Sequence, residues 1–176
     1  MLAQHSESHF TDAKTDLATC FIERSRSLLA LSGAAALVTP QNWLSQDHYA
    51  SYRKRLLRDG RLELAGQLGP GAFSGISGEV VKPLLIILDG RSHDGAHEFL
   101  AIDTTPSASA ADKAAALRAE ALSKVNQARQ LTNPKCRISM GEASDEARLS
   151  KLTIYSNGIQ TGDALRFLRS FWEVPA

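Results

Sequence analysis

Two short, continuous apolar runs constrain the fold of this chain more than any other feature. The run AAALVT covers residues 34–39, and the run PLLIIL covers residues 83–88. Unbroken runs of this length are typical of strands that are covered on both faces, as in the parallel sheets of α/β proteins. Pro83 has no N–H to give to a strand ladder, so we place it at the first residue of its strand. The sequence therefore predicts an α/β protein.

The segments around the first run complete an alternating pattern. Apolar residues at helical spacing predict a helix over residues 12–31, and Gly33 is expected to be the left-handed residue just past its end. A second helix is predicted over residues 45–59, and it leads into a strand over residues 61–68. Together, residues 34–68 read as a right-handed βαβ crossover or a close variant of one.

The character of the chain changes after residue 103. One more strand is predicted over residues 97–103, and the stretch TTPSASAADK that follows has the composition of a linker. An alanine-rich helix is expected from about residue 110 to residue 130, and a short helix near residues 144–152. We therefore predict two parts, residues 1–103 and a mostly helical extension over residues 104–176.

Composition and motifs exclude several classes of protein. Apolar residues make up 43% and charged residues 22% of the 176 residues, as in ordinary globular proteins, and the net charge of +1 gives no overall attraction to nucleic acid. No run approaches the ~20 apolar residues of a membrane span, and no basic and apolar leader follows Met1, so we expect a cytoplasmic protein. No P-loop, HExxH or zinc pattern occurs, so we predict no metal site and no catalytic residue in this chain.

Four cations lie in the predicted helix over residues 45–59: Arg53, Lys54, Arg55 and Arg58. Dense cationic charge displaces counterions from DNA, so these side chains are candidates for phosphate contacts. A solvated helix face explains the same cluster equally well.

Phe73 is the second candidate, because it is a large aromatic side chain in the glycine-rich stretch GPGAFSGISGE. In a loop that leaves the carboxyl end of a strand, an aromatic with nothing local to pack against is suited to stacking on a ligand. The alternative, that Phe73 folds under the loop as an anchor, is the simpler reading of composition alone.

Three segments, DLATCFIERSRSLLALSGAAALVTPQNWL, LGPGAFSGISGEVVKPLLIIL and GIQTGDALRFLRSFWEV, resemble the large N6-adenine DNA methyltransferases of bacterial phage defence. These are the BREX-type enzymes and their restriction-modification relatives. The resemblance implies part of a Rossmann-like, S-adenosylmethionine-dependent methyltransferase sheet, whose seventh and last strand is antiparallel. This chain resembles the distal half: the fifth strand at residues 34–39, the sixth at 61–68 and the seventh at 83–88.

The resemblance also implies roles for the candidate residues. Phe73 falls in the loop between the last two strands, where related enzymes place an aromatic that stacks on the flipped-out base. Thr39, Pro40, Gln41 and Asn42 leave the fifth strand at the carboxyl edge of the sheet, where open α/β folds bind ligands. Gln41 and Asn42 either donate and accept hydrogen bonds with substrate or cap the turn.

The family's glycine-containing cofactor loop and its Asn/Asp-Pro-Pro-aromatic tetrapeptide do not occur in this sequence. We therefore expect S-adenosylmethionine to bind the parent enzyme and not this chain alone. We also expect that this chain by itself is inactive. Expected partners are DNA, through the parent assembly, and a separate chain with the missing half. Because the fifth strand would lack its neighbour, self-association is the other expectation. The rival hypothesis is a non-catalytic truncated protein, or a module that binds nucleic acid or protein.

Overall fold

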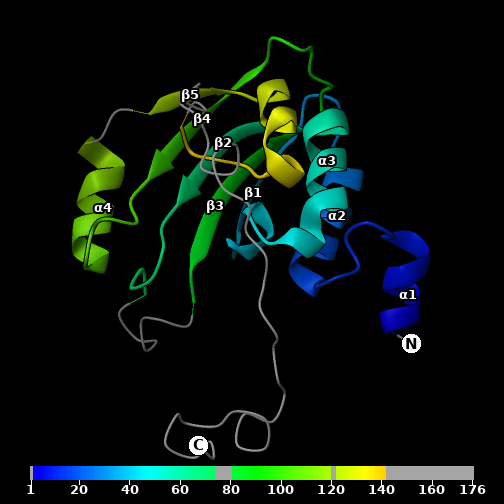
Figure 1. Ribbon diagram of the computed structural model, residues 1–176, viewed down its shortest axis with the longest axis horizontal. Helices are drawn as coiled ribbons and strands as arrows, with labels where there is room; N and C mark the ends of the chain where they lie inside the picture. The colour runs from blue at the N-terminus through cyan, green and yellow to red at the C-terminus, as the bar shows by residue number, and fades with distance from the viewer. Residues whose placement is uncertain (1, 74–80, 120–121, 142–176) are drawn as a thin grey trace, which may run out of the picture. The chain divides into compact units, whose positions relative to one another are not determined.

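The computed structural model describes residues 2–73, 81–119 and 122–141, and these form an α/β fold around one open sheet (Figure 1). The sheet has the order β1-β3-β2-β4-β5. Its strands are β1 (Ala34–Pro40), β2 (Arg61–Gln67), β3 (Pro83–Asp89), β4 (Glu98–Asp103) and β5 (Ser123–Asn126). The α-helices are α1 (Leu2–His9), α2 (Leu17–Ser27), α3 (Ala50–Asp59) and α4 (Ala110–Ala119).

Strand β3 lies between β1 and β2 and is antiparallel to both. Strands β1 and β2 therefore run in the same direction without touching, which is a variant of the predicted crossover. The pairs Pro40↔Pro83 and Gln67↔Leu84 bring the carboxyl ends of β1 and β2 to the same edge of the sheet, on either side of the start of β3. The predicted fold class, a partial Rossmann-like α/β sheet with an antiparallel last strand, is confirmed.

Two further strands extend the sheet beyond β2. Strand β4 is parallel to β2, and β5 pairs antiparallel with β4. The predicted helix over residues 110–130 is wrong beyond Ala119, because β5 follows and its Val125 is fully buried in the core. Pairing with β4 overrides the local helix propensity of the alanine-rich segment.

The predicted boundary after residue 103 falls inside a compact unit that includes the described residues up to 141. The short helix predicted near residues 144–152, and the third segment of the family resemblance, lie outside the described residues.

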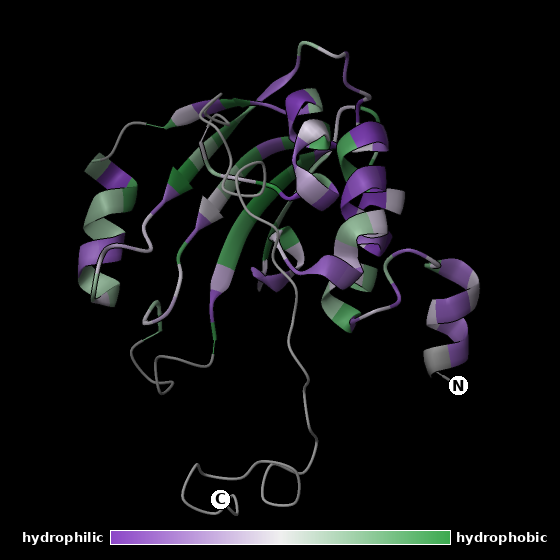
Figure 2. Ribbon diagram, viewed as in Figure 1, coloured by the Kyte–Doolittle hydropathy of each residue, from purple (hydrophilic) through white to green (hydrophobic). Residues whose placement is uncertain are grey.

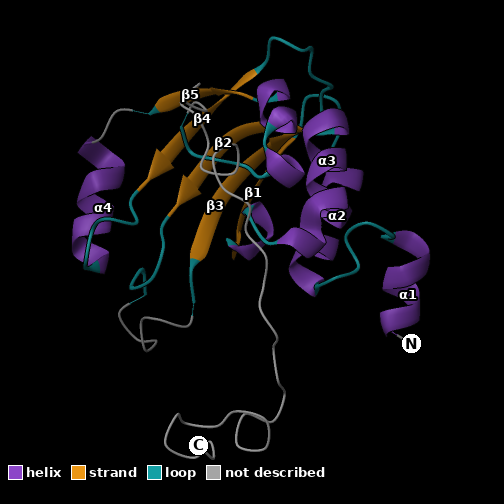
Figure 3. Cartoon of the chain, viewed as in Figure 1, coloured by secondary structure: helices purple, strands orange, loops and turns teal. Residues whose placement is uncertain are grey.

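The core lies between the sheet and α3, which Figure 3 shows beside the strands. Tyr52 and Leu56 of α3 are fully buried, as are Leu84 and Leu88 of β3. Trp43 completes this layer and meets Tyr52 edge-on, with ring centroids 5.7 Å apart. Figure 2 shows the corresponding apolar colour along the central strands. Each such side chain contributes about 1.5–3 kcal/mol through burial.

Strand β1 forms one edge of the sheet. Among the described strands it pairs with β3 alone, which agrees with the predicted unpaired edge. The prediction that its residues are covered on both faces is wrong, because exposure alternates along the strand and the side chain of Val38 is 63% exposed. Only one face of β1 has a covering layer in the described part of the chain.

The helices begin and end at other residues than the sequence predicted. Helix α2 starts after Asp16, whose Oδ1 accepts hydrogen bonds from the N–H groups of Ala18 (2.5 Å) and Thr19 (3.3 Å). Gly33 is not in a left-handed conformation, and its N–H closes a turn by donating to the carbonyl of Ala30. In place of the predicted helix over residues 45–59 the structure has a 3-10 turn, Asp47–Tyr49, followed by α3, and a further 3-10 turn, Asn42–Leu44, precedes them.

None of the described helices is long and apolar enough to span a membrane.

Candidate functional site

An open hollow of about 560 Å³ lies where β1 ends and β3 begins, at the carboxyl edge of the sheet. Amide and hydroxyl side chains dominate its lining. The lining residues are Pro40, Gln41, Asn42, Ser45, Gln46, Val81 and Lys82. The structure thus brings three of the four residues predicted at the end of the fifth strand to one surface, and we name it the β1-end hollow.

Thr39, the fourth residue, lies beneath the hollow and not in its lining. It is buried, and its Oγ1 accepts a hydrogen bond from Trp43 Nε1 at 3.1 Å. Trp43 in turn donates its backbone N–H to Asn42 Oδ1 at 3.0 Å. Thr39 therefore fixes the indole of Trp43, whose backbone N–H holds the side chain of the lining residue Asn42.

Asn42 is held by a polar chain that reaches back to α2. Its Nδ2 donates to the hydroxyl of Tyr49 (3.3 Å), and that hydroxyl donates to Asp16 Oδ2 (2.6 Å). Burial and the carboxylate of Asp16 raise the pKa of Tyr49 well above its usual value, so the hydroxyl stays protonated. Because Asn42 accepts from the backbone and donates to Tyr49, its role in the turn agrees with the capping alternative.

Gln41 offers the free hydrogen-bonding group of the hollow. Its backbone N–H donates to the carbonyl of Lys82 at 2.9 Å, which continues the β1–β3 ladder past Pro40. Its side-chain Oε1 is buried, and no group in the described ranges donates to it. A buried acceptor without a donor loses a water hydrogen bond with no compensation, so a rotation of this side chain that brings Oε1 to a ligand N–H in the hollow would be favourable.

Lys82 is a lining residue that the sequence analysis missed. Of the described residues that line the hollow it alone is charged, and no described carboxylate pairs with it. Its side chain is exposed, and it precedes the first residue of β3. Only the pairing of β1 with a strand more than forty residues later brings it beside Gln41, so no local pattern pointed to it.

Phe73 lies in the loop after β2, and its side chain is 45% exposed. Gly69 and Gly71, which precede it, have positive φ angles of 68° and 75°. A Cβ on Gly69 would stand 2.9 Å from Thr105 Cγ2, so the loop packs directly against the segment after β4. This close approach needs glycine. Phe73 is not one of the residues that line the β1-end hollow.

The basic cluster on α3 divides into different environments. Arg53 is fully buried, and its guanidinium donates to the carbonyl groups of four residues: Trp43, Gln46, Lys135 and Cys136. Burial lowers the pKa of Arg53 from its usual value. The prediction that Arg53 contacts phosphate is wrong, because its donors already point inward at backbone oxygens.

Arg55 pairs with acidic groups, through Nε with Asp12 at 3.3 Å and through Nη2 with Glu23 at 3.0 Å. Arg58 pairs with Asp59 at 2.8 Å but remains exposed, and Lys54 is exposed. The phosphate-binding hypothesis for this helix therefore rests on Lys54 and Arg58.

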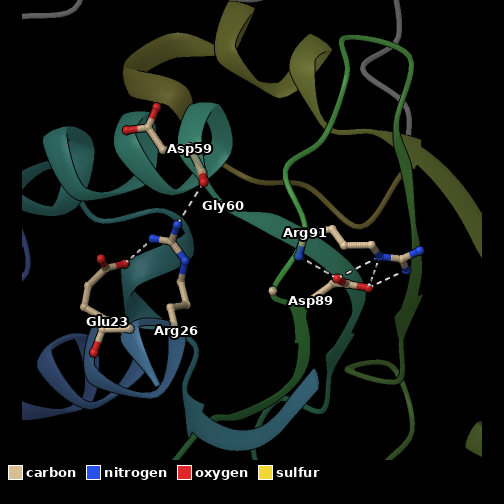
Figure 4. Close-up of a pocket in the computed structure, with 8 residues that line it drawn as sticks. Glu23, Arg26, Asp59, Gly60, Asp89 and Arg91 are labelled. Atoms are coloured by element: carbon tan, nitrogen blue, oxygen red, sulfur yellow. Dashed lines mark hydrogen bonds and ion pairs between the residues drawn. The ribbon is translucent and has the colours of Figure 1, made fainter. Parts of the chain in front are cut away.

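A second hollow, of about 210 Å³, lies at the opposite edge of the sheet between α2, the end of α3 and the end of β3 (Figure 4). Its charges pair with one another. Arg26 binds Glu23 at 2.8 Å, and Arg91 binds Asp89 at 2.5 Å, which holds the pKa of Asp89 well below its usual value. A hollow whose ions are already satisfied is a poor site for a charged ligand.

The described residues contain no group of three or more His, Cys, Asp or Glu side chains that could hold a metal ion. Two histidines of the segment between β3 and β4 contact the backbone: His93 Nε2 lies 2.8 Å from the carbonyl oxygen of Leu57, and His97 Nε2 lies 2.6 Å from that of Leu62.

Comparisons with known proteins agree on one class of enzyme. Residues 2–70 match the family model of the Eco57I restriction-modification methylases. The adenine-specific methyltransferase BrxX of Escherichia coli O9:H4 (strain HS) is 33% identical over 94 residues, which is 53% of this chain and 8% of the relative. The adenine-specific methyltransferase PglX of Lacticaseibacillus casei (strain Zhang) is 28% identical over 94 residues, again 53% of this chain and 8% of the relative.

Among solved structures, the methyltransferase subunit of the type I restriction-modification system of Streptococcus thermophilus is similar with a TM-score of 0.48 and 19% identity, over 65% of this chain and 27% of that one. The chain thus corresponds to a small share of the curated relatives, about one twelfth of each (8%). The predicted resemblance is confirmed: over residues 2–70 this chain is similar to the Eco57I restriction-modification methylases, and over 94 residues it is similar to the adenine-specific methyltransferases BrxX and PglX.

Proposed function

We propose that this chain is the distal part of a methyltransferase domain that transfers a methyl group from S-adenosylmethionine to N6 of a flipped-out adenine in DNA. The chain supplies base-pocket and scaffold residues to that domain. The observation that carries the proposal is the sheet order, in which antiparallel β3 separates the parallel strands β1 and β2 and gathers the candidate residues at their carboxyl ends. The adenine-specific relatives supply the reaction class.

Phe73 is proposed to stack on the extruded base. A base must leave the duplex before a methyl group can reach its exocyclic nitrogen, and an aromatic face stabilises the extruded base by ~1–3 kcal/mol. The half-exposed ring supports this role over the loop-anchor alternative, because an anchor would be covered. The contact of Gly69 with Thr105 fixes the loop backbone before Phe73. Binding of the base therefore does not have to order these residues.

Gln41 is proposed to meet the polar edge of the substrate. An acceptor without a donor suits an exocyclic amine, which is the group of adenine that receives the methyl group in this reaction. Pro40 and Asn42 shape the surface beside it. Strands are ~4.8 Å apart, so the ends of β1 and β2 lie about 10 Å apart across β3, a span that one nucleotide bridges.

S-adenosylmethionine would supply the methyl group in the parent enzyme. The described residues do not fit it: the glycine loop after β2 joins antiparallel strands, and the space where a ligand would approach Gly69 and Gly71 is taken by Thr105 and by the carbonyl of Ala108. We therefore assign cofactor binding to the part of the parent enzyme that carries the first strands of the sheet.

That part of the parent enzyme is also the proposed partner of the β1 edge. Beside this edge, α2 carries an exposed apolar stripe at helical spacing, Leu17, Phe21 and Leu28, of which Phe21 is 66% exposed. A strand edge next to an apolar helix stripe suits a strand with its own helix layer, on the same polypeptide or on a separate one.

The experiment that tests the proposal measures binding of the full chain to a duplex with one extrahelical adenine and to the matched duplex, by fluorescence anisotropy. Phe73→Ala should weaken binding to the extrahelical adenine by about 5- to 100-fold, and Phe73→Trp should retain it. Leu117→Ala, which removes another partly exposed apolar side chain on α4, is the control. The chain would instead be a nucleic-acid binding module if it bound both duplexes equally, lost that binding on Lys54→Gln and Arg58→Gln, and kept it on Phe73→Ala.

A further inference from the structure

Arg53 joins two segments that are far apart in the sequence. Its Nη1 donates to the carbonyls of Trp43 (2.8 Å) and Gln46 (2.7 Å), which stand at the two ends of the segment beside the β1-end hollow. Its Nε donates to Cys136 (3.1 Å) and its Nη2 to Lys135 (2.8 Å). Four of the five N–H groups of the guanidinium are therefore used on backbone oxygens.

The segment on the far side of this contact has an unusual backbone. Lys135 and Cys136 both have a φ of 53°, in the left-handed region that residues with a Cβ rarely adopt. Two consecutive left-handed residues turn both carbonyls toward the same guanidinium. Such a backbone persists only where its surroundings hold it, and Arg53 supplies that hold.

Two more contacts join the same pair of segments. Asp47, next to Gln46, forms ion pairs with Lys135 and with Arg137, the latter at 3.0 Å. The N–H of Ile138 donates to the carbonyl of Leu44 at 3.0 Å. The 135–138 segment is thus bound along the loop that carries Ser45 and Gln46, two lining residues of the hollow.

We propose that Arg53 is a positioning residue, which holds the 43–46 loop in the shape that the β1-end hollow needs by clamping it to the 135–138 segment. The inference rests on the proposed function of the hollow. It assigns to a residue of the basic helix a role in substrate binding that involves no contact with substrate. It also makes the 135–138 segment, which follows the predicted linker, a structural part of the pocket.

The geometry of the donors explains why arginine occupies this position. A planar guanidinium presents donors in fixed directions, so one side chain reaches two carbonyls of the loop and two of the far segment at once. A lysine has three donors around a single atom and does not span both sets. Arg53→Lys therefore keeps the positive charge and releases at least one segment.

The test compares Arg53→Lys with a control of equal burial. Gln127 is also fully buried and makes three hydrogen bonds, to Leu57, Gly60 and Leu62, at the amino end of β2 and away from the hollow. For each full-length variant we would measure urea unfolding, amide hydrogen exchange, and anisotropy with a short single-stranded DNA that holds one central adenine.

Both Arg53→Lys and Gln127→Leu should lower the urea midpoint. Only Arg53→Lys should speed exchange at the amides of Ser45, Gln46 and Ile138, and only it should weaken DNA binding, by about tenfold for the loss of one charge-assisted hydrogen bond. Unchanged exchange at these amides in Arg53→Lys would overturn the positioning role.

The two hypotheses fail separately. If the wild-type chain shows no preference for the DNA with adenine over the same DNA with thymine, the proposed function of the hollow fails, and the exchange data still decide whether Arg53 holds the loop. If the wild-type chain binds and Arg53→Lys binds within twofold of it, the role of Arg53 is stability alone and the proposal is overturned. If Arg53→Lys fails to fold, Asp47→Asn takes its place in the hydrogen-exchange and DNA-binding measurements. This variant removes the ion pairs that join the same two segments at the surface.

Discussion

Replacement of Gly69 by alanine tests whether the loop that carries Phe73 is fixed by close backbone packing. Two costs add at this position. A Cβ in the left-handed region costs roughly 1–2 kcal/mol, and Gly69 has a φ of 68°. The new Cβ would also stand 2.9 Å from Thr105 Cγ2 and 3.2 Å from Thr105 Cα, an overpacked contact that costs roughly 1–3 kcal/mol. Gly69→Ala should therefore lower the free energy of unfolding by about 2–5 kcal/mol.

The assay is equilibrium unfolding in urea, with Gly95→Ala as the matched control. Gly95 lies in the loop between β3 and β4, and a Cβ there would meet nothing within 4 Å. Its replacement should change stability by less than about 0.5 kcal/mol. The m-value should stay constant in both variants, because neither change alters the surface exposed on unfolding.

A second substitution separates the two costs of Gly69→Ala. Thr105→Ala removes Cγ2 and leaves Cα in place, so in this background the cost of Gly69→Ala should fall by about 1 kcal/mol or more, while the conformational part remains. A loss below about 1 kcal/mol for Gly69→Ala alone, or the same loss in both backgrounds, would refute the account of this loop.

Three further predictions concern other parts of the fold. The hydrogen bond from Lys135 lowers the pKa of Asp47 below its usual 3.8, so this pair stabilises the fold fully above pH 3.8 and stops doing so as the pH falls through the lower folded-state pKa. Asp47→Asn should therefore destabilise the protein at pH 7 and approach the stability of the wild type in acid, as measured by urea unfolding over a pH series. Val38→Lys should reduce self-association in sedimentation velocity, because a charge protects an open strand edge, and unchanged association would place the contact elsewhere. Tyr49→Phe removes the hydroxyl that binds Asp16, and should cost about 1–2 kcal/mol in thermal or urea unfolding, unless solvent replaces the bond.

The sequence predicted the bounds of the central strands well, because short apolar or alternating segments between turn residues are a local signal. The segments predicted at residues 34–39, 61–68 and 83–88 correspond to β1, β2 and β3 within one residue at each end. The antiparallel direction of β3 came from the family resemblance, because an apolar run carries no direction. Helix ends were predicted less well, since Asp16 acts as the cap of α2 through side-chain bonds that several nearby residues could have offered.

The features that sequence reasoning missed depend on contacts between distant segments. Arg53 sits among basic residues that are exposed or paired, and only the fold shows that carbonyls from residues 135 and 136 face it. Strand β5 has four residues in an alanine-rich context, and pairing with β4 is what defines it. Lys82 lies beside Gln41 because of the register in which β1 pairs with β3. The position of Phe73 and of residues 40–42 after strands could be predicted from the sequence because it is a local signal, and their roles toward substrate stay predictions.

The insertion of β3 between β1 and β2 sets an order for folding. Ala34 pairs with Asp89, so the first strand finds its partner only after more than fifty further residues have left the ribosome. During that interval β1 and β2 cannot pair through this sheet, because in the fold each of them bonds to β3 and they do not bond to each other. Long-range pairing of this kind is slow and leaves apolar strands exposed to other chains. A polypeptide that stopped at residue 70, where the family match ends, would contain β1 and β2 and lack β3, the strand that joins them.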